Sequence, residues 1–350
     1  MACNHPLHAF QVGINPETGK PKYKIRSGKI DWICKYENRL SYRAFTKEMY
    51  PKEWIIDEYI EVPCGKCIEC RLAYSRQWAD RCMLEAKSWE HNHFLTLTYD
   101  DEHLTQAQQI DLETGEVFKA PYATLVPEDL TKFMKDLRRY YQYHYGHDNI
   151  RFYACGEYGD KSGRPHFHVI VFNLPINDLV YFHTNHAHDK LYLSDTIAEI
   201  WGKGHVIVGD VTWNSAAYTA RYVMKKIKGP EAKNIYASMG LVPEFVRMSR
   251  REGIGKAYYE ENKDKIYEHD EIIITNAKGL AKTIKPSKYY DRLYDIEEPE
   301  IMAAIKAKRQ ELAKESMQIQ LSKTSLSKDE YLEVRERKKI KQVELLKRMI

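Results

Sequence analysis

The pattern of apolar and polar positions predicts alternating strands and helices between residues 91 and 230. Residues 94–99 and 166–173 alternate with a period of two, as β-strands do, whereas Pro127 opens a segment whose apolar residues recur every three or four positions up to Gly146. Strands are predicted over 94–99, 150–155, 166–173 and 205–211, and helices over 69–90, 127–145, 194–201 and 214–228. This order indicates an α+β fold in which helices flank a central antiparallel sheet.

Outside this core the pattern is weaker. The chain before the first helix is expected to be irregular, and a polar loop is expected between residues 100 and 126. We therefore expect a Cys-rich segment and helix over 1–90, the core over 91–230, an extension of that core over 231–300, and a helical tail over 301–350.

Composition narrows the class of protein. The chain has 350 residues, of which 43% are hydrophobic and 30% charged, a balance that predicts a soluble globular protein and not a disordered one. No apolar run approaches the roughly 18 residues of a membrane helix, and the N-terminus lacks a signal-peptide pattern. Seven cysteines, an odd number, favour a reducing compartment in which thiols are free to bind metal.

Positive charge is concentrated at the C-terminal end. Residues 301–350 hold 13 Lys+Arg against 7 Asp+Glu, a net of +6, so the first 300 residues carry −2 of the total +4. A basic helix can attract phosphate without sequence preference, but it can equally be a solvated surface helix. The tail is thus a candidate for non-specific DNA contact.

Histidine spacing points to a metal site. The chain has three His-x-His pairs: His91/His93, His166/His168 and His186/His188. Only His166 and His168 lie inside a well-defined strand, where residues two apart share a face and can bind one ion. Glu157 lies nine residues before His166 and would return beside it if residues 159–165 form a hairpin turn. This ligand set suits Mg²⁺ or Mn²⁺ on a phosphate, and also Zn²⁺.

A tyrosine pair follows the histidine strand. Tyr218 and Tyr222 lie four residues apart on one predicted helix, and Lys225 and Lys226 come one turn later. Cations beside a phenol favour the phenolate and attract phosphate. The spacing is also compatible with two aromatic residues that simply pack the helix on the sheet.

A second metal-ligand spacing occurs at Cys64, Cys67 and Cys70. An iron–sulfur run would need a fourth cysteine where Tyr74 stands. A structural Zn²⁺ needs one more ligand, for which Cys3, His5, Cys34 and Cys82 are the candidates, and reduced, partly buried thiols are the alternative. The chain has no G-x₄-G-K-[ST] phosphate loop, so no nucleotide cofactor is expected.

Five motifs in order carry a family resemblance. They are CGKCIECRLAYSRQWADRC, LTLTYDD, GEYG followed by GRPHFHVIVF, YTARYVMKK, and EFVRMSRREGIGKAYY. The second, third and fourth resemble the motifs of HUH endonucleases, and all five together resemble the replication initiator of gokushoviruses, single-stranded DNA phages of the Microviridae. The resemblance spans about residues 60–260 and does not cover the N-terminal 60 residues or the tail.

The resemblance implies a ferredoxin-like or RRM-like core in which Glu157, His166 and His168 hold a divalent cation. It also implies that Tyr218 and Tyr222 are the nucleophiles of a two-tyrosine enzyme, although a single-tyrosine enzyme that uses Tyr222 with Lys225 would have the same letters.

The expected function is rolling-circle initiation. The enzyme would nick one strand of single-stranded or replicative-form viral DNA at the origin, form a 5′-phosphotyrosine and rejoin the displaced strand. A host helicase would unwind the duplex, and the reaction would take place in the cytoplasm of the bacterial host, away from membranes. The alternatives are a non-enzymatic, zinc-stabilised nucleic-acid-binding protein and an HUH transposase.

Overall fold

The computed structural model describes residues 3–36, 46–111, 113–160, 162–185, 188–221, 231–275 and 281–345. Two compact units form, one from residues 1–73 with 308–347 and the other from residues 74–307. Helix α1 (Ile68–Ala86) begins in the first unit, and most of it belongs to the second. None of the helices in the described ranges is long and apolar enough to cross a membrane.

A seven-stranded antiparallel sheet is the centre of the second unit, which confirms the α+β class. Its spatial order is β11-β12-β13-β6-β10-β9-β14. The strands are β6 (Asn92–Thr98), β9 (Arg151–Tyr158), β10 (Pro165–Phe172), β11 (Val180–Thr184), β12 (Lys190–Leu193), β13 (Val206–Asp210) and β14 (Phe245–Met248). Strands β6, β10 and β9 are therefore neighbours in the middle of the sheet.

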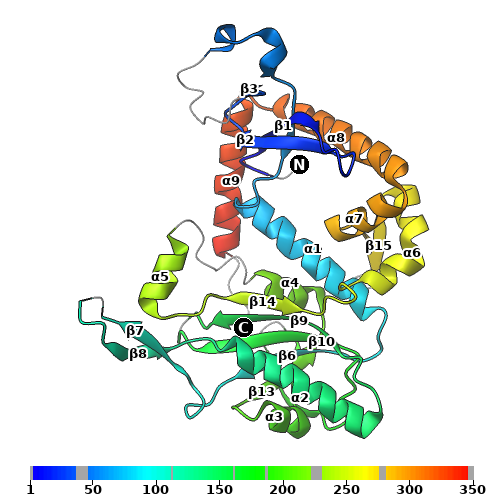
Figure 1. The fold of residues 1–350 in the computed structure, drawn as a ribbon. Coiled ribbons are helices and arrows are strands. Elements are labelled where there is room, and N and C mark those ends of the chain that lie inside the picture. The colour runs from blue at the N-terminus through cyan, green and yellow to red at the C-terminus, as the bar shows by residue number, and fades with distance from the viewer. Residues whose placement is uncertain are drawn as a thin grey trace. The chain divides into compact units, whose positions relative to one another are not determined.

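The two faces of the sheet are covered by different helices (Figure 1). Helices α2 (Pro127–Tyr145) and α3 (Asp195–Trp201) pack on the face that carries Phe167, Val169 and Val171. Helix α4 (Trp213–Arg221) and the later part of α1 pack on the opposite face. Because successive side chains of a strand point to opposite faces, His166 and His168 of β10 lie on the face that α4 covers.

Helix α2 matches its sequence signals. Pro127 is at its N-terminal end, and Gly146 ends it in the left-handed conformation with φ 74°, which a residue without a Cβ adopts at no steric cost. The predicted apolar stripe is confirmed, since Leu130, Phe133 and Leu137 are buried in the core beneath the sheet.

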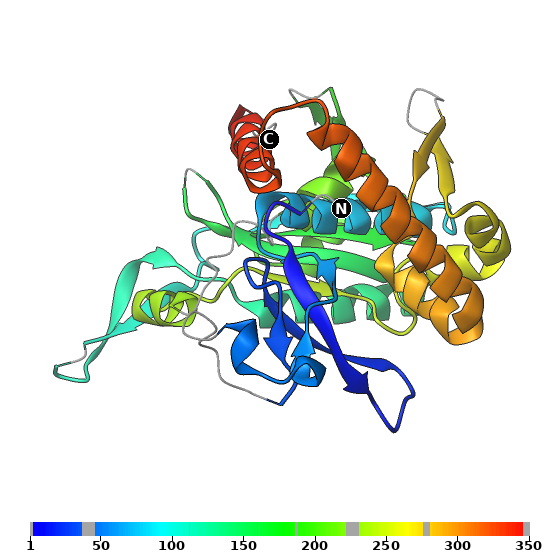
Figure 2. The ribbon, with the colours of Figure 1, turned by 90° about the horizontal axis from the view of Figure 1, so that it is seen from above.

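The expected polar loop before residue 126 is wrong. Strands β7 (Gln106–Ile110) and β8 (Val117–Ala123) form a separate hairpin, and α5 (Ala232–Met239) lies alongside it (Figure 2). The amide of Gln109 donates to the carbonyl oxygen of Ser238 at 3.1 Å. Most of its residues are exposed, and neither QAQQI nor VFKAPYA shows the regular alternation of apolar and polar residues that predicts a half-buried strand.

Tyrosine side chains fill a second core after the sheet ends. It is built from α6 (Lys256–His269), β15 (Ile272–Thr275), β16 (Ala281–Ile284), α7 (Lys288–Glu297) and the start of α8 (Pro299–Leu321). Tyr259 and Tyr290 are fully buried there, and Leu84 of α1 belongs to the same cluster.

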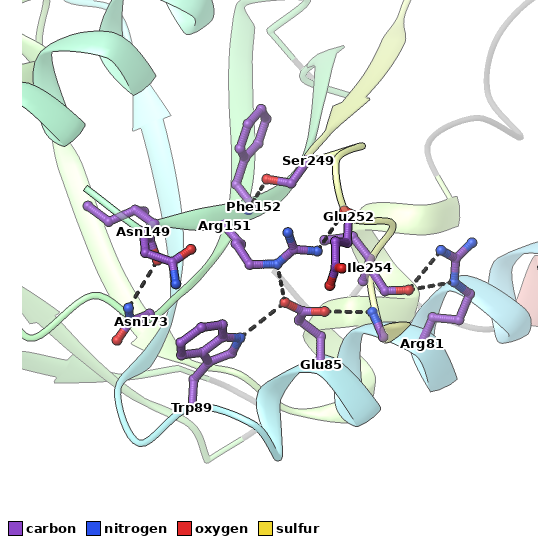
Figure 3. A network of polar contacts seen from close by, with 12 residues as sticks. Arg81, Glu85, Trp89, Asn149, Arg151, Phe152, Asn173, Ser249, Glu252 and Ile254 are labelled. Atoms are coloured by element: carbon purple, nitrogen blue, oxygen red, sulfur yellow. Dashed lines mark hydrogen bonds and ion pairs between the residues drawn. The ribbon is translucent and has the colours of Figure 1, made fainter. Parts of the chain in front are cut away.

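A buried carboxylate joins α1 to the segment 249–255 (Figure 3). Glu85 is 2% exposed, and its Oε1 accepts hydrogen bonds from Nε of Arg151 and, at 3.0 Å, from Nε1 of Trp89. Its Oε2 accepts from the backbone N–H of Gly255 at 2.5 Å. Three donors satisfy one buried charge, so α1 is held firmly against the end of the sheet.

The first unit is also more regular than expected, which corrects the prediction of an irregular start. Strands β1 (Leu7–Ile14), β2 (Pro21–Ser27) and β5 (Tyr59–Val62) form an antiparallel sheet in the order β2-β1-β5. Short elements complete it: β3 (Ile33–Cys34), β4 (Ile55–Ile56) and the 3₁₀ helices η2 (Lys47–Met49) and η3 (Lys52–Trp54).

The C-terminal tail is helical, as predicted, but α9 (Lys328–Leu345) packs within the first unit. Leu332 is 3% exposed, and Glu336 accepts a hydrogen bond from Nε2 of His5 at 2.6 Å. Lys328 pairs with Glu61 of β5. Most residues of α9 are still exposed or half-buried, so its packing is confined to a few contacts.

Candidate active site

The hairpin between β9 and β10 forms as the sequence predicted. In its turn, the N–H of Gly159 donates to the carbonyl oxygen of Arg164 at 2.9 Å. The register sets Glu157 directly opposite His166. Since cross-strand partners share a face, the carboxylate and both histidines lie on the α4 side of the sheet.

Three ligand atoms converge. Nε2 of His166 lies 2.7 Å, and Nε2 of His168 3.0 Å, from Oε1 of Glu157. The exposed fractions of the three side chains are 15% for His166, 3% for His168 and 1% for Glu157. The group is one of two in the described residues whose ligand atoms lie within 4.8 Å of one another. Two imidazoles and a carboxylate in this arrangement fit one divalent cation.

The far nitrogen of each imidazole has its own partner. Nδ1 of His166 donates to the carbonyl oxygen of Arg164 at 3.1 Å, and Nδ1 of His168 lies 3.1 Å from the hydroxyl oxygen of Thr96. The Arg164 carbonyl oxygen can only accept, so it favours a proton on Nδ1 of His166 and leaves Nε2 to face the metal position. The Thr96 hydroxyl can play the same part for His168 by accepting from its Nδ1.

Aromatic rings fix the plane of His168. The ring of Phe94 stacks on it with centroids 5.3 Å apart at 13°, and the ring of Tyr218 meets it edge-on at 5.1 Å and 79°. Burial raises the pKa of Glu157, but its hydrogen bonds with the two imidazoles lower it by more, so the net pKa is below the ordinary value. The carboxylate is thus ionised and ready to bind a cation.

Helix α4 brings Tyr218 to this site. Small residues on its inner face, Ala216 and Ala217, are buried against the sheet and allow a close approach. The hydroxyl of Ser75 on α1 donates to the carbonyl oxygen of Ala217 at 3.1 Å. Tyr222, Lys225 and Lys226 lie outside the described residues, so their predicted roles stay predictions.

The other two histidine pairs do not form comparable groups among the residues that the structure describes. His93 lies in β6, and burial lowers its pKa. His188 is exposed, with φ 65°, in the turn after β11, while His186 lies outside the described residues.

Sequence reasoning missed several residues that position the site. Thr96 and Phe94 lie in the strand predicted over 94–99, but their contacts with His168 were not predicted. Gly156 precedes Glu157, and a Cβ there would come within 2.7 Å of the ring of Phe245. The signal for Thr96 was available, because a strand paired to β10 must place every second residue beside the histidines.

The Cys-rich segment also gathers its thiols. The sulfurs of Cys64, Cys67 and Cys70 are joined by that of Cys3, one of the four candidates for the missing ligand. Burial raises the pKa of Cys3 and raises that of Cys70 to about 11. Burial also opposes ionisation of Cys67, but hydrogen bonds from Asn4 and Cys70 lower its pKa to about 7.

Comparison with known proteins gives the family. The family model described as replication-associated protein ORF2 matches residues 92–227, the stretch that holds the histidines, Glu157 and Tyr218. The chain is 40% identical over 285 residues to the replication-associated protein ORF2 of Spiroplasma virus 4, which covers 80% of this chain and 82% of that relative. The chain belongs to the family of phage replication-associated proteins.

Two further members of this family support the assignment. The replication-associated protein VP4 of Bdellovibrio phage phiMH2K is 32% identical over 268 residues, 75% of this chain and 77% of the relative. The replication-associated protein ORF4 of Chlamydia phage 1 is 38% identical over 169 residues, 47% of this chain and 38% of the relative. These matches confirm the resemblance to gokushovirus initiators, whereas no solved structure matches the chain.

Proposed function

We propose that this replication-associated protein is an HUH-type endonuclease that nicks one strand of viral DNA at the origin and starts rolling-circle replication. The observation that carries the proposal is the convergence of Glu157, His166 and His168, with the ring of Tyr218 against His168. A buried three-ligand group beside a tyrosine combines a cation site with a nucleophile, the two parts that phosphodiester exchange requires.

Glu157, His166 and His168 would hold a Mg²⁺ or Mn²⁺ ion. Such an ion, when bound, supplies Lewis acidity to a non-bridging phosphate oxygen and offsets the charge that develops during displacement. The protein's part is to keep the imidazoles oriented, which the contacts with Thr96 and the Arg164 carbonyl do.

The tyrosine supplies the nucleophile. The phenol oxygen of Tyr218 or Tyr222 loses its proton and forms a bond to phosphorus, the bond from phosphorus to the 3′-oxygen breaks, and that oxygen takes up a proton as the free 3′-OH. One phosphoester bond replaces another, so the step needs no nucleotide. A second tyrosine one helical turn away can attack the regenerated origin while the first still holds the displaced strand; a one-tyrosine enzyme would use Tyr222 with Lys225 as its neighbour.

Electrostatics would assist at the end of the helix. Lys225 and Lys226 follow the tyrosines by one turn in the sequence and would attract the scissile phosphate. The substrate in this proposal is single-stranded or replicative-form viral DNA at the origin, with a host helicase supplying strand separation.

Alanine substitution of each proposed ligand tests the metal site. His166→Ala, His168→Ala and Glu157→Ala should each strongly reduce cleavage of a labelled single-stranded origin oligonucleotide in Mn²⁺. His188→Asn is the matched control, because His188 is exposed and asparagine tolerates its positive φ. Undiminished cleavage in the three ligand variants, with circular dichroism showing that they are folded, would refute the site; loss in the His188 variant would relocate it.

A further inference from the structure

Four cysteine thiols meet in the first unit, away from any role in the proposed nicking reaction. Cys3 precedes β1, Cys64 and Cys67 precede α1, and Cys70 lies in the first turn of α1. Their sulfur atoms all lie within 4.8 Å of one another, although 61 residues separate Cys3 from Cys64. Four cysteines within bonding reach of one point match the ligand set of a structural metal site.

The sulfur separations fit a single tetrahedral ion. The sulfurs of Cys3 and Cys67 are 3.9 Å apart, and those of Cys64 and Cys70 are 4.0 Å apart. Zinc–sulfur bonds of about 2.3 Å in a tetrahedron place the sulfurs about 3.8 Å from one another. A disulfide would need about 2.05 Å, and all four cysteines are free. An iron–sulfur cluster would need more room, because its irons and sulfides lie between the cysteine sulfurs.

Backbone N–H groups are directed at these sulfurs. Those of Cys64 and Asn4 point at the sulfurs of Cys3 and Cys67, at 3.3 and 3.5 Å. The N–H groups of Lys66 and Cys67 point at the sulfur of Cys64, at 3.4 and 3.3 Å. Such donors, together with the N-terminal end of α1 beside Cys70, stabilise thiolates, which are the form that binds metal.

We propose that Cys3, Cys64, Cys67 and Cys70 bind one structural Zn²⁺. Four thiolates complete a tetrahedral shell and leave no position for water or substrate, so the ion stabilises the fold and takes no part in chemistry. It would clamp the segment before β1 to the start of α1 and thereby close the first unit. The site is independent of the proposed nuclease and would persist if that proposal failed.

Elemental analysis of the full chain, purified under reducing conditions without chelator, tests this directly. We expect about one zinc per chain, released when a mercurial titrates the thiols. The double variant His166→Ala/His168→Ala should keep that zinc, which separates it from any ion at the candidate active site. Zinc-free protein, bound iron in place of zinc, or zinc that follows the histidines would overturn the proposal.

Variants of Cys3 test the fourth ligand. Cys3→Ser should lose the zinc, Cys3→His should retain it because Cys₃His is also a structural zinc set, and Cys34→Ser should retain it because Cys34 is buried in the same unit but outside the cluster. If Cys3→Ser does not fold, the unaltered chain loaded with Co²⁺ still decides: four thiolates give intense sulfur-to-cobalt charge-transfer absorption. A weak spectrum typical of nitrogen and oxygen ligands, or a Cys3–Cys67 disulfide by mass spectrometry, would contradict the site.

Discussion

Replacing Thr96 with valine should weaken metal binding without touching a ligand. The Thr96 hydroxyl lies 3.1 Å from Nδ1 of His168, opposite His168 in the β6–β10 register. Valine keeps the shape and β-branching but removes the hydroxyl that contacts the imidazole and orients it. Loss of such an outer partner typically lowers metal affinity about 10- to 100-fold, or about 1.4 to 2.7 kcal/mol.

The assay is the rate of origin-oligonucleotide cleavage as a function of Mn²⁺ concentration. In Thr96→Val the half-saturating Mn²⁺ concentration should rise by that factor, while the rate at saturating Mn²⁺ should approach that of the parent. Thr98→Val is the control, because the Thr98 hydroxyl donates to the carbonyl oxygen of His205 at 3.1 Å and not to a histidine ring. Equal Mn²⁺ dependence in Thr96→Val and the parent, or equal losses in both variants, would refute the reasoning.

Three other predictions concern stability and DNA binding. Glu85→Ala should lower the free energy of unfolding, measured in urea, by about 3–5 kcal/mol, because it leaves the largely buried guanidinium of Arg151 without its carboxylate partner. The control Glu90→Ala should change little, because the Glu90 side chain is 88% exposed. Similar losses of stability in both variants would contradict the role of the Glu85 network. Truncation before α9 should make the first unit more sensitive to proteolysis, because buried Leu332 is removed. Where α9 neutralises DNA phosphates, the same truncation should reduce the slope of log affinity for single strands against log salt by about 0.7 for each phosphate. An unchanged slope would mean that the basic residues of α9 are solvated surface. Because the pKa of Glu157 is lowered in the folded protein, its ionised form stabilises the metal-free protein above the ordinary pKa of 4.5, and this stability is lost as the pH falls through the lower pKa of the folded state. Glu157→Gln should remove that part of the pH dependence of stability, measured by urea unfolding. The same pH dependence in the variant and the parent would contradict this prediction.

Local patterns predicted the centre of the molecule well. The period of two in residues 166–173 predicted that His166 and His168 share one face of a strand, and this is confirmed, with Phe167 between them buried in the core on the other face. The turn residues between β9 and β10 correctly predicted that Glu157 would return beside the histidines. These inferences depend on one strand or one short hairpin, where sequence spacing determines geometry directly.

Long-range pairing could not be predicted in the same way. The choice of Cys3 over His5, Cys34 or Cys82 depends on how β1 pairs with β5, and no spacing within one segment reports that. Strand β2, with the sequence PKYKIRS, is largely exposed and polar, so it lacks the alternation that reveals a half-buried strand. Strand β14 extends the sheet with residues that lie after position 230 in the sequence. Its place there depends on its pairing with β9, which the local sequence pattern does not show.

The most direct test of the account is whether a tyrosine becomes covalently joined to DNA. The protein is incubated with a labelled single-stranded origin oligonucleotide and Mn²⁺, denatured, and examined for labelled protein, alongside Tyr218→Phe, Tyr222→Phe and the double variant. We expect an adduct whose label maps to one of these tyrosines, no adduct in the double variant, and nearly unchanged DNA affinity, since only two hydroxyls are removed. An adduct that persists in the double variant, or cleavage by the parent that leaves a free 5′-phosphate and no adduct, would contradict the tyrosine mechanism.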